Sequence, residues 1–268
     1  FVNLEYLYLS GKGLSGTIPP EIKNLTKLKY LKLYGPGLSG HIPDGIYNLT
    51  QLKHLDLSHN SLDGPIHPEI KNLTKLKYLD LSDNSLDGTI PPIELLVNLE
   101  QLKLSLNSLD GPIPPIGTLK NLQDLNLSHN KLSGPIPTIG TLTKLHDLDL
   151  RDNELSENIP PIGTLKKLKY LDLRFNKLTG PIPPGIKNLD KIEQAYLAYN
   201  ELTGPIPTMN PKPVKLEYLD LTDNCINKEY LEEYEDTRPW WLHTYPQNYD
   251  DNTPDDYDIP DRKNLCNS

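Results

Sequence analysis

One pattern returns along most of this 268-residue chain, and it constrains the fold more than any other feature. Residues 55–66 read LDLSHNSLDGPI, and residues 79–90 read LDLSDNSLDGTI. Aligned on the first leucine of LxxLxLxxNxLxGxIP, ten units follow one another at intervals of 23 or 24 residues. Their first positions are Leu4, Leu28, Leu52, Leu76, Leu99, Leu122, Leu145, Leu168, Ile192 and Leu216. This period predicts a solenoid over residues 1–226, followed by a non-repeating cap and acidic tail over 227–268.

The fixed letters of each unit predict a short strand followed by turns. In LxxLxL the leucines alternate with polar residues, which is the period of two expected for a strand with one buried face. Because one unit cannot bury its leucines alone, the units should stack and share a continuous core. The 26 prolines exclude long helices from most of the chain. We expect an α/β solenoid with a parallel concave β-sheet and a convex side of 3₁₀ turns and extended segments.

The repeat also separates positions that keep the same residue in most units from positions that vary between units. An asparagine column is expected to turn its amides inward onto backbone groups; it comprises Asn60, Asn84, Asn107, Asn130, Asn153, Asn176, Asn200 and Asn224. The five variable positions within each LxxLxLxxN are expected to project from the concave sheet into solvent, so that Ser128, for example, would be exposed. Function would then reside in these variable letters.

The LxGxIP stretch points to a family. It appears as LSGTIP at 14–19, LSGHIP at 38–43, LSGPIP at 132–137 and LTGPIP at 178–183. In these residues the chain resembles plant-type leucine-rich repeat proteins, and the resemblance implies a horseshoe or superhelix like the ectodomains of plant receptor kinases and polygalacturonase-inhibiting proteins. The chain departs from the pattern at Lys12 and Pro36, where the repeat has Asn, and at Glu157, where it has Gly. It also lacks the paired cysteines that flank the family's repeats at the N-terminal end.

Charge and composition exclude several classes of protein. The net charge is −9, of which the tail carries −7 with eleven acidic and four basic residues, so the repeats hold no basic stripe for nucleic acid. No run of eighteen apolar residues and no signal peptide is present. The first repeat starts next to Phe1 without a polar cap, which indicates a missing upstream segment or self-association through an uncapped edge.

Motifs for catalysis are also missing: there is no G-x-S-x-G elbow, P-loop or H-E-x-x-H. We therefore expect no enzyme and no cofactor. Histidine and aspartate do meet across the strands, as at His54, Asp56 and His59 beside the next repeat, and such groups can hold zinc. An ordinary polar sheet surface explains them better, so no metal is predicted.

Cysteines and sequons indicate an extracellular or cell-surface location. Cys225 and Cys266 could form a disulfide that fastens the tail to the last repeat, with a loop-closure stabilisation of roughly 3–4 kcal/mol. Four N-x-Ser/Thr sequons stand at Asn24, Asn48, Asn72 and Asn126, although the first three also belong to the repeat. Trp240 and Trp241 are expected to cover the core of the last repeat.

Aromatic residues mark the candidate binding face. One group at the N-terminal end of the concave sheet contains Tyr6, Tyr8, Tyr30, Lys32 and Tyr34. A second group at the C-terminal end contains Tyr170, Arg174, Phe175, Tyr196, Tyr199 and Tyr218, with Asp149 and Arg151 between the groups. Since Tyr, Trp and Arg are common interface anchors, we expect a protein or peptide partner on this face. A self-assembling structural protein, a carbohydrate-binding module and, less favoured, an ice-binding protein are the alternatives.

Overall fold

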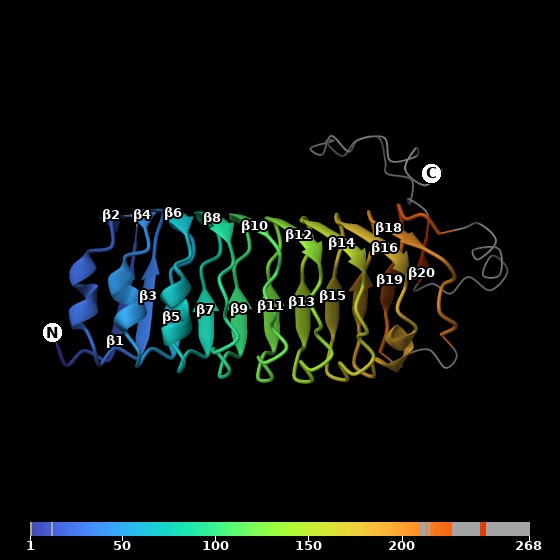
Figure 1. The fold of residues 1–268 in the computed structure, drawn as a ribbon, viewed down its shortest axis with the longest axis horizontal. Coiled ribbons are helices and arrows are strands. Elements are labelled where there is room, and N and C mark those ends of the chain that lie inside the picture. The colour runs from blue at the N-terminus through green and yellow to red at the C-terminus, as the bar shows by residue number, and fades with distance from the viewer. Residues whose placement is uncertain (1, 12, 210–212, 214, 227–241, 245–268) are drawn as a thin grey trace.

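The described repeats of the protein form one long stack (Figure 1). The computed structural model describes residues 2–11, 13–209, 213, 215–226 and 242–244. Two parallel β-sheets run along the stack, and each strand pairs with the equivalent strand of the next repeat. The expected α/β solenoid with a parallel concave sheet is confirmed.

The concave sheet has eleven strands in the described part of the chain, in strict sequence order. They are β1 (Tyr6–Ser10), β3 (Tyr30–Tyr34), β5 (His54–Asp56), β7 (Tyr78–Asp80), β9 (Gln101–Lys103), β11 (Asp124–Asn126), β13 (Asp147–Asp149), β15 (Tyr170–Asp172), β17 (Gln194–Tyr196), β19 (Tyr218–Asp220) and β20 (Leu242–His243). The register is one repeat per strand, so that Leu31, Leu55 and Leu79 lie side by side. The last strand, β20, follows the repeats and pairs with β19.

A second sheet of nine strands forms where the sequence indicated only turns. Its strands are β2 (Ser15–Gly16), β4 (Gly37–His41), β6 (Ser61–Pro65), β8 (Ser85–Thr89), β10 (Ser108–Gly111), β12 (Lys131–Pro135), β14 (Glu154–Asn158), β16 (Lys177–Pro181) and β18 (Glu201–Thr203). Each strand lies at the LxG stretch of a repeat, or, in β14, at the LSE that replaces it. The stacking of repeats brings these short segments next to one another, and neighbouring backbones then satisfy their hydrogen bonds.

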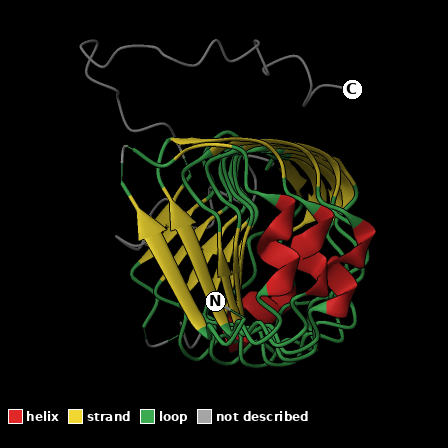
Figure 2. Cartoon of the chain, turned by 90° about the vertical axis from the view of Figure 1, so that its left-hand side faces the viewer, coloured by secondary structure: helices red, strands yellow, loops and turns green. Residues whose placement is uncertain are grey.

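In repeats 1–8, repeat length and the structure of the convex side vary together. The repeats of 24 residues that begin at Leu4, Leu28, Leu52 and Leu168 carry 3₁₀ helices: η1 (Pro20–Asn24), η2 (Asp44–Asn48), η3 (Pro68–Asn72) and η4 (Pro184–Asn188). The four repeats of 23 residues between them cross the same side in extended segments and turns. Figure 2 shows the 3₁₀ helices on the side of the stack opposite the first strands of the concave sheet. The described residues contain no α-helix, as the proline content predicts.

The core is one continuous column of leucine and isoleucine between these layers. Leu55 and Leu57 are 1% and 0% exposed, and the equivalent leucines of the other inner repeats are buried as well. Fully burying one such side chain stabilises the fold by about 1.5–3 kcal/mol. At the equivalent positions of the first repeat the leucines are less buried: Leu4 and Leu7 are partly buried, and Leu9 is 44% exposed.

The asparagine column turns inward, as expected. Asn130 Nδ2 donates to the carbonyl oxygens of Leu104, Leu127 and Ser128 at 3.0, 3.1 and 3.2 Å. Its Oδ1 accepts from Leu109 N at 3.0 Å in the preceding repeat. Each asparagine thus fastens its own turn to the repeat before it.

Two departures from the repeat have visible consequences. Pro36 replaces the asparagine of the column in repeat 2; in the next repeat, Asn60 Oδ1 is buried without a hydrogen-bond partner among the described residues. Glu157 takes the left-handed backbone conformation of the glycine that it replaces, with φ 63° against 66–77° for the glycines of most other inner repeats. A non-glycine residue is strained in that region.

Candidate interaction surface on the concave sheet

The predicted binding residues form two separate clusters at opposite ends of the concave sheet. The predicted residues of the N-terminal cluster lie on β1 and β3, and the structure adds His54 on β5 and Tyr78 on β7. The C-terminal cluster has Tyr170, Tyr196 and Tyr218 on β15, β17 and β19, and its other members follow β15 and β17. Strands β9, β11 and β13 stand between the two clusters. Because each repeat contacts only its neighbours, the solenoid keeps the clusters apart.

Stacked rings build the N-terminal cluster. Tyr30, His54 and Tyr78 lie in register, with ring centroids 4.1 Å apart at both steps and interplanar angles of 10° and 4°. Tyr6 continues the row, 6.3 Å from Tyr30. His54 and Tyr78 were not among the predicted binding residues, although their position in the repeat matches that of Tyr30.

Ring stacking argues against one alternative function. Each face of the His54 ring is covered by a tyrosine, and Tyr30 and Tyr78 each have one face covered by His54. Sugar recognition by stacking requires an open aromatic face. His54 therefore offers only its edge to a partner, which suits hydrogen bonding better than stacking on a sugar ring.

Ion pairs hold the polar groups of this cluster in place. Lys32 Nζ lies 2.5 Å from Asp56 Oδ2 and 5.3 Å from the centroid of the Tyr34 ring. The hydrogen bond to Asp56 is the main reason that the pKa of Lys32 is raised. His59 Nδ1 lies 2.5 Å from Asp83 Oδ2. Tyr6 and Tyr8 at the end of the sheet are 67% and 59% exposed.

A buried carboxylate organises the C-terminal cluster. Asp172 is 0% exposed, and its Oδ2 accepts from Tyr170 Oη at 2.9 Å and from Arg174 Nη2 at 2.6 Å. Arg151 Nη1 reaches the same oxygen at 3.4 Å. The hydrogen bonds to Asp172 raise the pKa of Arg174. Asp172 thereby fixes three of the predicted anchors, because none of them can move without giving up this bond.

Aromatic contacts extend the cluster across the next two repeats. The Arg174 guanidinium lies 4.5 Å from the centroid of the Tyr196 ring, which is 5.2 Å from the Tyr218 ring. Phe175 and Tyr199 stack at 4.4 Å with an interplanar angle of 9°. All four aromatic side chains are half-buried, so each contributes a rigid surface that is still accessible to a partner.

The expectation that every variable position projects into solvent was wrong. Asp56, Asp80 and Asp172 are buried, at 2%, 7% and 0% exposure, and Asp149 is 9% exposed. These carboxylates accept the backbone N–H two residues on, as in the bond from Ser82 N to Asp80 Oδ1 at 3.0 Å. The strand ends there, so that N–H needs a side-chain acceptor.

Two predicted roles change as a result. Asp149 was predicted to contact a partner, but it is buried. Its carboxylate accepts a hydrogen bond from Arg151 N at 3.2 Å, so its role here is to satisfy a backbone N–H group. Burial is the main reason that its pKa is raised. Ser128 is 1% exposed and donates to Asn126 Oδ1 at 2.7 Å, so it is not the exposed serine that was expected.

The C-terminal half of the concave sheet is acidic. At the variable positions of repeats 1–5, five acidic residues face five lysines, whereas repeats 6–10 carry nine acidic residues against Arg151, Lys169 and Arg174. The nine are Asp124, Asp147, Asp149, Asp152, Asp172, Glu193, Glu217, Asp220 and Asp223. We call these five repeats the acidic half.

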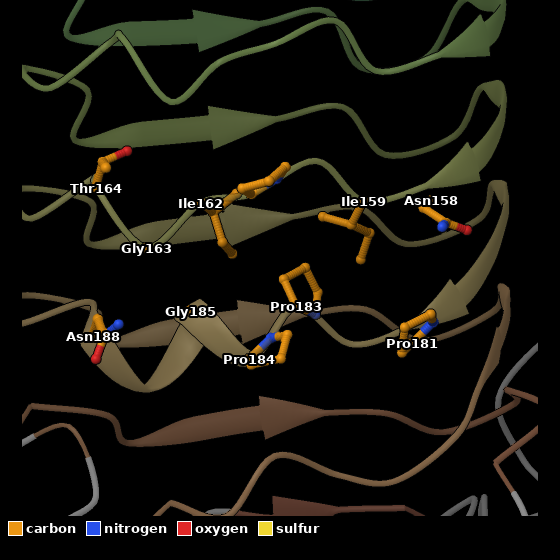
Figure 3. Close-up of a pocket in the computed structure, with 11 residues that line it drawn as sticks. Asn158, Ile159, Ile162, Gly163, Thr164, Pro181, Pro183, Pro184, Gly185 and Asn188 are labelled. Atoms are coloured by element: carbon orange, nitrogen blue, oxygen red, sulfur yellow. The ribbon is translucent and has the colours of Figure 1, made fainter.

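Two hollows of the described surface lie near these residues or on the convex side. A small pocket of about 190 Å³ lies beside the C-terminal cluster and is lined by His129, Arg151, Asp152, Arg174 and Phe175. A larger apolar groove of about 480 Å³ opens on the convex side between repeats 7 and 8 (Figure 3). It forms where the extended segment of one repeat meets η4 of the next, and the glycines Gly163 and Gly185 touch there, because a Cβ at Gly185 would lie 2.9 Å from Gly163 Cα.

The remaining sequence predictions fall on different parts of the surface. Asn24, Asn48 and Asn72 are exposed at the ends of η1, η2 and η3. Asn126 is half-buried on β11, and its Oδ1 accepts from Ser128 N at 3.0 Å. That bond and the neighbouring strands leave little room for a glycan.

Other predictions concern metals, membranes and the tail. Among the described residues, no group of three or more His, Cys, Asp or Glu side chains is placed to hold a metal ion. None of the described helices has the length and apolar character needed to cross a bilayer. Trp240, Trp241 and Cys266 lie outside the described residues, so the cap and the disulfide stay predictions.

Comparison with known proteins identifies the family. The profile "Leucine Rich Repeat" matches residues 3–25, 51–73, 75–94 and 121–142, and related leucine-rich repeat profiles match 143–191 and 212–229. No curated protein sequence matches the chain. A solved plant ice-binding protein is 32% identical, with a TM-score of 0.54, over 75% of this chain and 74% of that protein. This chain belongs to the leucine-rich repeat family.

Within the family, plant receptor ectodomains are similar to it. The ectodomain of the Arabidopsis thaliana membrane receptor kinase GASSHO1/SCHENGEN3, solved with CASPARIAN STRIP INTEGRITY FACTOR 2, is 36% identical with a TM-score of 0.75. The plant peptide hormone receptor RGFR1, solved with RGF2, is 35% identical with a TM-score of 0.66. The matches cover 84% and 79% of this chain, but only 30% and 38% of those two chains.

Proposed function

We propose that this chain is a non-enzymatic extracellular recognition scaffold that binds a protein or peptide partner on its concave sheet. The observation that carries the proposal is the C-terminal cluster, in which Asp172 holds Tyr170 and Arg174 in fixed positions beside Tyr196. Anchors that are already ordered lose little side-chain entropy when a partner binds, which favours affinity. The cluster therefore has the properties of a preorganised interface.

The relatives support the same proposal. The GASSHO1/SCHENGEN3 LRR ectodomain was solved in complex with CASPARIAN STRIP INTEGRITY FACTOR 2, and the plant peptide hormone receptor RGFR1 in complex with RGF2. A receptor-like and an inhibitor-like role both fit a scaffold of this kind. An extracellular location also agrees with the predicted disulfide between Cys225 and Cys266 and with the three exposed sequons.

The proposal is tested by selecting binders from a displayed random-peptide library on the full chain. Selected peptides should lose affinity for a Tyr196→Ala or a Tyr8→Ala variant and keep it for Lys187→Ala, whose side chain is exposed on η4 of the convex side. A few aromatic anchors dominate most interfaces, so one of the tyrosine variants should weaken binding by roughly tenfold or more. Melting temperatures must be measured on every variant. Binding that depends on Lys187 and on neither tyrosine would place the functional surface elsewhere.

Ice binding is a second candidate, favoured by one observation. The plant ice-binding protein is similar over 74% of its own length, a larger share than either receptor ectodomain reaches. The second sheet adds a regular surface, because Ser39 and Ser61 lie side by side on β4 and β6 with both residues exposed. Exposed carboxylates at Asp63, Asp87 and Asp110 interrupt it. An assay of ice recrystallisation decides this candidate: growth of ice crystals at the control rate would exclude it.

A further inference from the structure

The acidic half differs from the rest of the concave sheet in how its charges are paired. In the N-terminal repeats, lysines neutralise acidic residues of the neighbouring strand, as in Lys29–Glu5 at 2.8 Å and Lys77–Glu100 at 2.7 Å. In the acidic half both arginines, Arg151 and Arg174, form ion pairs with Asp172. Arg151 also lies 3.6 Å from Asp149. Few cations remain for the other carboxylates.

Asp147 is the clearest case of an unpaired charge. It lies on β13, in register between Asp124 on β11 and Tyr170 on β15, and it is exposed. No cationic side chain of the described residues lies within ion-pair distance of its carboxylate, whereas Asp124 is bound by Lys103 at 3.2 Å. Packing around the Asp147 carboxylate and repulsion from Asp124 raise its pKa, although His146, Lys169 and Lys103, which lie beyond ion-pair distance, partly offset that rise. A positive group placed here would relieve that repulsion.

The chain itself shows how this surface binds a cation. Arg174 donates to Asp172 while its guanidinium lies over the Tyr196 ring at 4.5 Å. A carboxylate and an aromatic ring together are a favourable setting for a guanidinium, because the ion pair and the cation–π contact add. One repeat earlier and two residues earlier along the strand, Asp147 and Tyr170 bring a carboxylate and a ring into register, and no ion pair reaches Asp147.

We propose that the partner is a basic peptide segment, which docks a lysine or arginine side chain on Asp147 and packs a neighbouring apolar residue on Tyr170 and Tyr196. This inference rests on the proposed function and specifies the chemistry of the partner. Charge complementarity carries it: the acidic half holds six more acidic than basic residues at its variable positions, while the N-terminal half is balanced. An acidic peptide would meet repulsion on the same surface.

The test uses the full chain and the same displayed peptide library. Peptides are selected on the wild-type chain, sequenced, and measured against Asp147→Asn and against Asp87→Asn. The second variant is the matched control, because Asp87 is an exposed aspartate on β8 of the other sheet and its loss changes the net charge equally. Melting temperatures establish that both variants are folded, and Tyr196→Ala reports whether a peptide binds the concave sheet.

The expected result is that selected peptides are enriched in lysine and arginine and bind Asp147→Asn about tenfold more weakly than the wild type or Asp87→Asn. Their affinity should fall as salt rises from about 0.1 M to 1 M, since a partly exposed ion pair is screened. Peptides that depend on Tyr196 but show no basic enrichment, or that bind Asp147→Asn as well as the wild type, would overturn this inference and leave the proposed function in place. A selection with no peptide dependent on Tyr196 or Tyr8 would overturn both.

Discussion

Replacing Asn130 by alanine tests whether the asparagine column holds the repeats together. The side chain has two N–H donors, shared among three backbone carbonyls, and one oxygen that accepts from Leu109 N. Alanine removes about three hydrogen bonds at a net value of roughly 0.5–1.5 kcal/mol each, which gives a loss of about 3 kcal/mol. Asn130 is half-buried, so water can replace only part of these bonds.

The matched control is Asn98→Ala, which makes the same chemical change at an exposed position. Asn98 Nδ2 donates only to Thr74 O, at 2.9 Å, and water can take its place. The control should lose no more than about 0.5 kcal/mol, as surface substitutions generally do.

Equilibrium unfolding in urea, followed by circular dichroism, measures both variants. The midpoint of Asn130→Ala should fall well below that of Asn98→Ala at an unchanged slope, and its melting temperature should fall by roughly 6–12 °C. A changed slope would mean that the stack no longer unfolds as one unit. Equal midpoints for the two variants would refute the reasoning, because the column would then contribute nothing beyond an exposed hydrogen bond.

Three further predictions concern single features of the chain. Glu157→Gly should stabilise the fold by about 0.5–1 kcal/mol, because glycine relieves the left-handed strain at φ 63° and outweighs its own entropy cost; Glu157→Ala, which keeps the strain, should not. Burial raises the pKa of Tyr47 to about 12, so its stabilising contribution is complete below pH 10 and is lost as the pH rises from 10 to 12. The Tyr47→Phe chain should therefore lose roughly 2–3 kcal/mol less than the wild type over that range, and equal losses in urea titrations would contradict the assignment. Thiol alkylation under native conditions should label neither Cys225 nor Cys266, and labelling of both would rule out the disulfide.

Periodicity determined the stack of repeats and its concave sheet, but not the second sheet. The leucines of LxxLxL predicted the buried face of the repeat strands of the concave sheet, and the asparagines predicted the inward column, because both sets make the same contacts in each repeat. The absence of long helices followed from proline. The buried leucines and the asparagine column depend on contacts between residues one repeat apart. The repeat length of 23 or 24 residues can be read directly from the sequence.

Only the tertiary structure decided which variable residues face a partner. Asp172 and Ser128 look like surface residues in the sequence, yet they are buried. The strand ends early, so Asp172 turns inward to accept the N–H of Arg174, and Ser128 donates its hydroxyl to the side chain of Asn126. The stack of Tyr30, His54 and Tyr78 depends on contacts between residues 24 positions apart. These contacts form between side chains at variable positions of neighbouring repeats. The repeat pattern does not specify those side chains, so it cannot predict how they pack.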